Sequence, residues 1–564
     1  MAIVLAMTTP VRGYHIDPHG ALPTAYWPLM ALSFSTASGA YAAGTDWSRR
    51  FAAGLLLGCF LEAMLLPTQL GIATYGRYDQ MTHLGIIQDI LDEGGSDSSN
   101  FYPATHLLYT ALGVWTGLPV LRVSLLGGAL FSIVFVWGCL AFYRTTFPRL
   151  FLVASPWLLP SLLILYHGWS HFSIIPNFVF YSLIPATLAV HRMWRIEGGW
   201  LWTTSLMLML AISVFGHPFV TLFWIAYLGY DALRSWLLGR PLSLFAFAIF
   251  TIGSAAWILF GEGLEAALVR AASAATSGEL DSVAAKGVGQ ASRITPSAAE
   301  MVSIVWFLGA RFLVPFGFVA LLGARVLRAR VWRGHPEASE WRHLAEWGFL
   351  LVGLQAALLL NGIVSHTPNR LLNISFVTLL LPLCFALALA WRKRRDGRGR
   401  PTLRLHGPRP GFVASSLLLG ILFATSLAGA MDSPRSFTPA NTMHANEMTS
   451  AAWLLEHKDP SALALDVQGS FLYRQAWYHM GRDVEEPDAR IPKALPIPDH
   501  FAGDLHGLAD SDHYVIFTSI GRQLYTTLYD EIGRFTDADF EAVEESRNYF
   551  LVYQGRDTAY LLRA

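Results

Sequence analysis

Long apolar runs recur along most of this chain, and they constrain its fold more than any other feature. We place them at 25–43, 51–70, 121–143, 150–167, 173–191, 199–216, 218–233, 241–260, 301–324, 345–363, 371–390 and 411–430. Most of them are long enough to cross a hydrocarbon core of about 30 Å as a helix. Lipid offers the backbone no hydrogen-bond partners, so spanning segments of this kind should be helical. The sequence therefore predicts a mainly α, polytopic membrane helix bundle of about 12 spans.

Composition supports this class and excludes others. Only 14% of the residues are charged and 53% are hydrophobic, whereas a soluble domain has about 25% charged residues. The basic runs are short and lie between apolar runs, so membrane topology explains them better than nucleic-acid binding. The sequence has no glycine-rich nucleotide motif and no Cys/His spacing typical of a metal site.

Charge is divided unevenly along the chain. From Met431 to the end there are 21 acidic and 11 basic residues, a net charge of −10, so residues 1–430 carry +10. The arginines and lysines of the first part fall in alternate loops, at 49–50, 144–149, 192–195, 234–240, 325–333 and 392–400. Loops rich in these residues stay in the cytoplasm. We therefore predict a multi-pass plasma-membrane protein whose other loops, and whose tail, lie outside the cytoplasm.

The tail has the pattern of a separate small domain. It alternates a helix-like stretch at 446–456 with strand-like stretches at 462–466, 513–519 and 549–553, and a hairpin over 553–560 closes it. About 130 residues suffice for a small α/β domain. We predict two domains: a membrane domain over residues 1–430, and an extracytoplasmic α/β domain over residues 431–564.

The outer segment at 71–120 combines polar side chains with two predicted helices. Apolar residues at helical spacing predict a helix over 82–93, which Gly94-Gly95-Ser96 ends, with Asp89, Asp92 and Glu93 at its solvated end. A second helix is predicted from Pro103 to Trp115, too short to span. Both should lie flat on the outer surface, with aromatic side chains at headgroup depth.

Asp79 is the strongest candidate for chemistry in this segment. It lies a few residues beyond a span and four residues before His83, so the two could share a helix face. A carboxylate there could act as a general base toward an acceptor hydroxyl, or hold a divalent cation such as Mg²⁺ or Mn²⁺. The alternative is an ordinary solvated loop acid. His83, Asn100, Tyr102 and His106 surround the same segment, and each histidine could instead be structural.

Three residues of other outer turns are further candidates for substrate binding: His171, His217 and Arg370. Arg370 is a basic residue beside a span on a side otherwise depleted of them, so it could pair bidentately with a phosphate. Snorkelling to lipid headgroups is the alternative for Arg370. His217 could equally be a helix-packing residue.

The pattern Asp79-x-x-x-His83-Leu-Gly, followed by Asn100-Phe-Tyr-Pro-x-x-His106, resembles polytopic membrane glycosyltransferases of the GT-C superfamily, and most of all their archaeal members. The likeness covers the topology of the whole chain, while the motif covers about 30 residues. In that superfamily an acid in the first large outer loop serves as base or metal ligand, and Asp79 matches that position. Here the loop follows the second visible span rather than the first. No WWD-type motif is present, which favours a monosaccharide transferase over a peptide oligosaccharyltransferase.

The resemblance implies transfer of a hexosyl or pentosyl group from a polyprenyl- or dolichyl-phosphate-linked donor to an extracytoplasmic glycan, lipid or protein. The resemblance carries a catalytic role to Asp79 alone. We predict in addition that His83 is catalytic and that Arg370 neutralises the donor phosphate. Two alternatives stay open: an oligosaccharide ligase or polymerase on the same face, and a lipid-linked sugar flippase or transporter. Transporters often have paired halves, and the sequence shows no internal symmetry.

Overall fold

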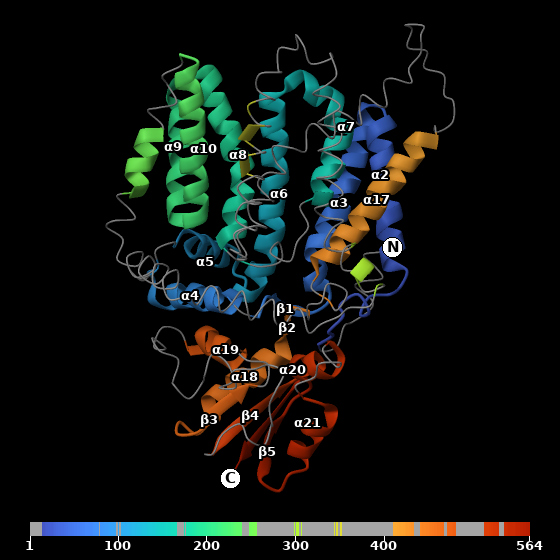
Figure 1. Ribbon diagram of the computed structural model, residues 1–564, viewed down its shortest axis with the longest axis vertical. Coiled ribbons are helices and arrows are strands. Elements are labelled where there is room, and N and C mark those ends of the chain that lie inside the picture. Colours follow the sequence, from blue (N-terminus) through green and yellow to red (C-terminus); the bar gives the residue numbers. More distant parts are fainter. Residues whose placement is uncertain are drawn as a thin grey trace.

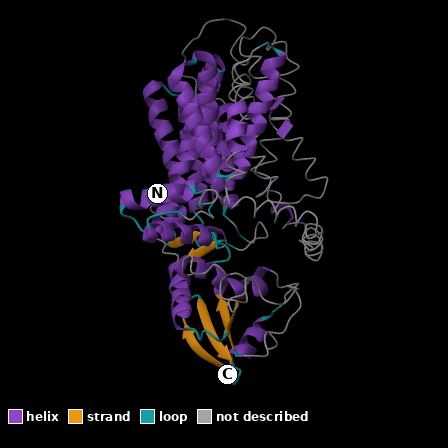
Figure 2. Cartoon of the chain, turned by 90° about the vertical axis from the view of Figure 1, so that its left-hand side faces the viewer, coloured by secondary structure: helices purple, strands orange, loops and turns teal. Residues whose placement is uncertain are grey.

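The computed structural model describes residues 14–77, 79–96, 100, 103–165, 174, 176–239, 247–255, 410–431, 433, 440–466, 471–480, 512–528 and 535–563, with isolated positions between 298 and 351. They form a bundle of long helices with a smaller α/β region at one end of it (Figure 1). Seen from the side, the long helices lie above a short strand pair and a larger sheet (Figure 2).

The bundle consists, within the described residues, of helices that coincide with predicted spans. They are α2 (Tyr26–Ala43), α3 (Asp46–Gln69), α6 (Val120–Thr146), α7 (Pro148–Leu165), α8 (Pro176–Glu197), α9 (Gly199–Gly216), α10 (Pro218–Leu237) and α17 (Pro410–Ala430). Four of the described helices, α3, α6, α9 and most of α17, are long and apolar enough to cross a membrane. A membrane-type helical fold is therefore confirmed. The total of about 12 spans stays a prediction, because the spans at 301–324, 345–363 and 371–390 lie mostly outside the described residues.

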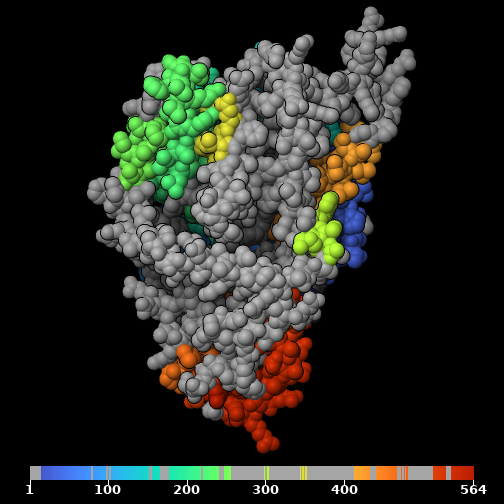
Figure 3. Space-filling view, viewed as in Figure 1, coloured from blue at the N-terminus to red at the C-terminus, as the bar shows by residue number. Residues whose placement is uncertain are grey.

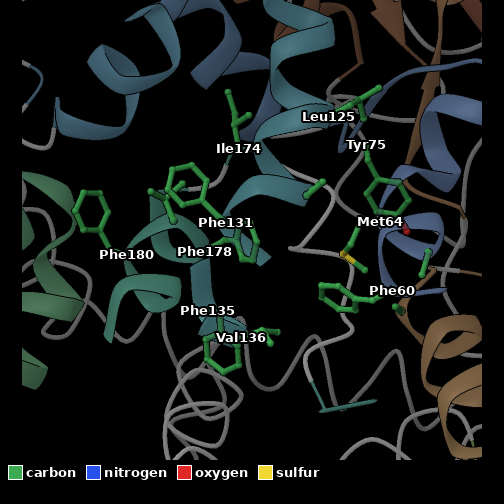
Figure 4. Close-up of a cluster of buried hydrophobic side chains, with 14 of the residues drawn as sticks. Phe60, Met64, Tyr75, Leu125, Phe131, Phe135, Val136, Ile174, Phe178 and Phe180 are labelled. Carbon is green, nitrogen blue, oxygen red and sulfur yellow. The ribbon is translucent and has the colours of Figure 1, made fainter. Parts of the chain in front are cut away.

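Aromatic and aliphatic side chains fill the centre of the bundle. Figure 4 shows Phe60 and Met64 of α3 close to Tyr75, with the buried aromatic residues of α6 and α8 beside them. The two helices α6 and α8 approach closely at Gly138, where a Cβ would lie 2.7 Å from the backbone nitrogen of Ala186. Small residues at such crossings let backbones pack tightly where lipid supplies no hydrophobic driving force.

Two shorter helices, α4 (Asp79–Glu93) and α5 (Ala104–Thr116), run across the lower end of the bundle in Figure 1. Both predicted helices are confirmed, although α4 begins three residues earlier than expected, at Asp79. An acidic residue suits the first turn, where the helix dipole is positive. The outward face of α5 exposes apolar side chains, and Trp115 is 80% exposed.

The acids at the end of α4 do not all face solvent. Asp92 and Glu93 are exposed as expected, but Asp89 is buried, with 8% exposure. The expectation for Asp89 was wrong. Helix α4 is not solvated all round, since α19 (Phe471–Met480) packs against it. Helix α4 therefore has the bundle on one side and the C-terminal part of the chain on the other.

The C-terminal part of the chain, residues 440–563, forms a four-stranded sheet with helices on it. Its elements are β2 (Thr442–His444), α18 (Ala445–His457), β3 (Leu463–Asp466), α19, β4 (His513–Thr518), α20 (Ser519–Gln523), the π-helical turn η5 (Leu524–Leu528), α21 (Asp537–Glu544), β5 (Tyr549–Gln554) and β6 (Thr558–Arg563). The strand order is β3-β4-β6-β5. Strands β3 and β4 are parallel, and the other two pairs are antiparallel. The helix and strands expected from the sequence are all present, each within one residue at either end.

The two faces of this sheet pack against different partners. Val515 and Phe517 of β4 join a small core with Phe540 of α21. Tyr514 and Ile516 alternate with them and belong to the main core, which continues into the bundle. This alternation is the period of two that a strand imposes. The main core therefore runs without interruption from the bundle into the C-terminal part, which the space-filling view shows protruding at one end (Figure 3).

A short antiparallel ladder joins the outer segment to the C-terminal part. Strand β1 (Ile72–Tyr75) pairs with β2, with Thr74 opposite Met443 and Tyr75 opposite Thr442. The chain leaves β1 through Gly76, whose φ of +116° only glycine adopts without strain. Helix α4 starts three residues later. The position of α4 is therefore set by a ladder whose second strand comes from the far end of the sequence.

Candidate functional site

The beginning of α4 is held by hydrogen bonds from both directions. Gln80, in the first turn, donates from Nε2 to Thr74 Oγ1 at 3.2 Å and accepts from the Ile174 backbone N–H at 2.7 Å. The Gln80 side chain is 2% exposed. It ties α4 both to β1 and to the segment that precedes α8. Asp79, the first residue of the helix, has its backbone fixed by these neighbours.

Two buried histidines meet between α4 and α5. His83 Nδ1 and His106 Nε2 are 2.9 Å apart, and Asn100 Nδ2 lies 2.9 Å from His106 Nδ1. His106 is fully buried and His83 is 8% exposed. We call Asn100, His106 and His83 the histidine chain. All three residues belong to the segment that the sequence marks as a candidate site, and the structure brings them into one hydrogen-bonded group.

The direction of the histidine chain follows from the Asn100 amide. An amide nitrogen only donates, so His106 Nδ1 accepts and His106 carries its hydrogen on Nε2. That hydrogen is donated to His83 Nδ1, so His83 carries its own hydrogen on Nε2. Burial, and next the charge of His83, hold the pKa of His106 well below its usual value. A pKa in that range keeps the imidazole of His106 neutral near pH 7.

The remaining candidates are placed as follows. His217 forms the tight turn between α9 and α10, where its carbonyl accepts from the Val220 N–H at 3.0 Å. It is half-buried, at the end of the bundle that α5 covers. Tyr102, His171 and Arg370 lie outside the described residues, and so does the side chain of Asp79. Their predicted roles stay predictions.

A metal site is not complete within the described side chains. Among them, no group of three or more His, Cys, Asp or Glu residues could hold a metal ion. Of the predicted cation ligand, Asp79, only the backbone belongs to the described part of the chain. A Mg²⁺ or Mn²⁺ site at Asp79 stays a prediction.

A buried ion pair beside the site was not predicted. Arg77 Nη2 lies 2.7 Å from both carboxylate oxygens of Glu447, and the two side chains are 1% and 0% exposed. Burial raises the pKa of Glu447, and the Arg77 guanidinium acts in the opposite direction. Arg77 was visible in the sequence as a basic residue next to Asp79. Its partner, 370 residues away, carried no local signal.

A second unpredicted acid lies within the bundle. Glu62 of α3 is 4% exposed and accepts a 2.6 Å hydrogen bond from Gln69 Nε2 on its Oε2. Its other oxygen, Oε1, has no hydrogen-bond partner among the described residues. An acid inside an apolar run is a sequence signal in itself, because an ionisable group in a membrane span is costly. Glu62 could have been noted on that ground.

A contrasting cluster lies at the other end of the bundle, near the ends of α8 and α10. Asp231 Oδ1 is 2.7 Å from Arg195 Nη1 and 3.4 Å from His343 Nε2, and its Oδ2 is 3.7 Å from His191 Nε2. Asp231 is 1% exposed. We call these four residues the Asp231 cluster. About 20 residues of α8 separate it from Ile174 at the α4 end, which is about 30 Å of helix. The sequence predicts this end to be cytoplasmic.

Comparisons with known proteins give a likeness of fold. No protein-family model matches the chain, and no curated protein matches it. The chain is similar to the crystal structure of the Archaeoglobus fulgidus oligosaccharyltransferase tethered to an acceptor peptide with the NVT sequon, at 12% identity and a TM-score of 0.49, over 92% of this chain and 75% of that one. The structure of that enzyme with Zn and sulfate gives 15% identity and a TM-score of 0.48, over 89% and 72%.

A bacterial structure is also similar. ArnT from Cupriavidus metallidurans, in the apo state, gives 11% identity and a TM-score of 0.38, over 92% of this chain and 98% of that one. Identities of 11–15% carry no activity, substrate or metal over to this chain. Function therefore has to be inferred from the site itself.

Proposed function

We propose that this protein is a membrane glycosyltransferase that transfers a sugar from a polyprenyl-phosphate-linked donor to an acceptor outside the cytoplasm. The observation that carries the proposal is the histidine chain, which is buried between two helices lying across one end of an apolar bundle. There a lipid tail can lie among the bundle helices, while polar groups meet the phosphate and the sugar. Asp79 begins the same helix, one turn before His83.

In the proposed reaction, the acceptor oxygen attacks the anomeric carbon of the donor sugar. The bond between that carbon and the phosphate oxygen breaks, and the electron pair leaves with the lipid phosphate. Asp79 takes the proton of the acceptor hydroxyl as general base. Transfer by this single displacement inverts the anomeric configuration. The sugar is a hexose or pentose, and the acceptor is a glycan, a lipid or a protein.

Charge develops on the departing phosphate, and donors aimed at it lower the barrier. His83 supplies one such donor through Nε2–H, because Asn100 and His106 fix its tautomer. Arg370 supplies a second, bidentate donor in this proposal. The described side chains do not complete a cation site, so no step is assigned to a metal. Residues 440–563 lie against α4 and would contact the acceptor.

The test is a transfer assay on the purified full chain in lipid vesicles, with labelled polyprenyl-phosphate sugars, with and without Mg²⁺ or Mn²⁺. The Asp79→Asn variant should lose transfer by a factor of about 10²–10⁴ and fold normally. Asp92→Asn is the matched control: Asp92 is an exposed acid on the same helix and accepts hydrogen bonds from the Gln88 side chain. Full transfer by Asp79→Asn would refute the assignment. Movement of the donor across the membrane without transfer would support a flippase instead.

A further inference from the structure

The start of α4 is fixed by residues from the C-terminal part of the chain. The Gly76 backbone N–H donates to the Asn441 carbonyl at 2.7 Å, and the Arg77 backbone N–H donates to Asn441 Oδ1 at 2.9 Å. Both bonds extend the β1–β2 ladder by one step toward α4. Asn441 therefore holds the two residues that precede the turn into Asp79.

The Arg77 side chain continues in the same direction. Its Nη2 meets both oxygens of Glu447, a residue of the first turn of α18, at 2.7 Å. Glu447 Oε2 also accepts from the His444 N–H at 3.1 Å. The carboxylate thus bridges β2, α18 and Arg77. A fully buried charge pair of this kind fixes two elements relative to each other, since leaving either charge unpaired is costly.

A third segment encloses the pair. The Tyr14 ring lies 5.0 Å from the Arg77 guanidinium carbon, a cation–π distance. Tyr14 is itself held by its backbone N–H, which donates to Asp557 Oδ1 at 3.0 Å, and by its hydroxyl, which donates to the Ala440 carbonyl at 3.1 Å. Arg77 is therefore surrounded by protein on the side of the C-terminal part. With 1% exposure, it is placed to hold structure and not to bind substrate.

We propose that Arg77 and Glu447 are positioning residues: through their ion pair, the C-terminal part of the chain sets the position of the first turn of α4 and so of Asp79. The inference rests on the proposed function, in which Asp79 reacts with the acceptor. Arg77 lies two positions before the first residue of α4, so a shift of its guanidinium is transmitted directly to that turn. Misplacement of a reacting group by about 1 Å can cost 10²-fold in rate.

The first measurement separates kcat from KM. Glu447→Gln keeps the shape of the side chain and removes its charge, and Arg77→Lys keeps the charge and removes the bidentate contact. In the transfer assay we expect kcat to fall about 10- to 100-fold in Glu447→Gln, with the KM for the donor changed less than about threefold. Arg77→Lys should retain more kcat than Arg77→Gln. A purely structural role would not produce this order at equal amounts of folded protein.

The matched control is the other buried ion pair. Asp231→Asn removes a carboxylate that is 1% exposed and 2.7 Å from Arg195, at the far end of the bundle. It should lower the thermal midpoint about as much as Glu447→Gln while leaving kcat within about twofold of the wild type. Equal loss of kcat in Asp231→Asn and Glu447→Gln would overturn the inference.

The second measurement does not depend on activity. Hydrogen exchange followed by mass spectrometry reports on the peptide that covers residues 72–84. We expect faster exchange there in Glu447→Gln and unchanged exchange in Asp231→Asn. Unchanged exchange together with unchanged kcat in Glu447→Gln would overturn the inference. If the wild type transfers no sugar, the proposed function fails, and faster exchange in Glu447→Gln alone would still support the positioning of α4 by Glu447.

Discussion

The two ends of the bundle bury similar residues and use them differently. At the α4 end, His106 contacts another imidazole and a neutral amide. At the opposite end, His191 and His343 lie within 3.7 Å of the Asp231 carboxylate. Burial beside a second imidazole disfavours a positive charge, whereas a buried carboxylate favours one. In the first arrangement, burial and the charge of His83 hold the pKa of His106 low, whereas the second places a carboxylate beside its histidines.

This difference in the surroundings of the histidines indicates which cluster is suited to chemistry. The Asp231 carboxylate has Arg195 and two histidines around it, so its charge is compensated inside the protein. The histidine chain has a direction: its donor hydrogens point from Asn100 through His106 to His83. A directed chain of donors that ends on α4 can stabilise charge that appears during a reaction. A compensated cluster mainly holds helices together.

The largest expected effect on stability comes from breaking the ion pair at the α4 end. Arg77→Met leaves Glu447 buried without its cation, which should cost about 3–5 kcal/mol of unfolding free energy. The corresponding Arg195→Met leaves Asp231 with His191 and His343, so the loss should be about 1–3 kcal/mol. Equilibrium unfolding in mixed micelles measures both. A larger loss of unfolding free energy in Arg195→Met than in Arg77→Met would contradict the view that Asp231 is the better compensated of the two buried carboxylates.

The next largest expected effect is the dependence of stability on pH. Burial, and after it the charge of Arg77, lower the pKa of His444 to about 4, and burial with the charge of His83 lowers that of His106. These two imidazoles therefore bind protons near pH 6.5 in the unfolded chain but not in the folded chain. The free energy of unfolding falls as the pH drops from about 6.5 toward 4. For His444 alone the loss is on the order of 3 kcal/mol.

The thermal midpoint between pH 7.5 and 4.5 measures this loss, and His444→Asn supplies the control. That variant lacks the His444 imidazole, so its midpoint should depend less steeply on pH in this window. An identical slope in the wild type and in His444→Asn would remove His444 from the explanation.

Activity distinguishes the two groups of histidines. His83→Gln removes the donor at the end of the histidine chain, and we expect kcat for transfer to fall about 10- to 100-fold, the value of one hydrogen bond to a developing charge. His191→Gln alters the Asp231 cluster and should leave kcat within about twofold of the wild type. The same vesicle assay measures both variants. Loss of transfer in His191→Gln alone would move the site to the opposite end.

The parts that the sequence predicts well are those governed by local pattern. Apolar runs predict the bundle helices, and the glycine at 94, with φ of +77°, ends α4 where expected. The tail strands follow from alternation, and β4 shows it directly in its two cores. Asn100 and His106 could be grouped because only five residues separate them. In each case the signal lies within a short stretch of the sequence.

The parts that escape prediction depend on distant residues. Arg77 meets Glu447 across 370 positions, and α4, in which Asp89 is buried, packs against α19, a helix almost 400 residues further on. Neither contact can be recognised from the local sequence pattern, since a buried Arg and an exposed Arg look alike in a single sequence. Glu62 is different, because its apolar surroundings were visible. It was missed although an acid inside a span is a signal in itself.

The smallest expected effect on stability comes from replacing two exposed tryptophans, and these variants also show on which side of the membrane each end of the bundle lies. Trp115 on α5 is 80% exposed, and Trp236 on α10, at the Asp231 end, is 64% exposed. Replacing either by Cys should change the unfolding free energy by less than about 0.5 kcal/mol, because neither ring packs in the core. If the α4 end lies outside, a membrane-impermeant thiol reagent should label Trp115→Cys in intact cells, and Trp236→Cys only after permeabilisation. The wild type, with its three native cysteines, gives the background. Labelling of both variants from the same side would contradict the orientation deduced from the loop charges, and with it the placement of the histidine chain at the outer surface.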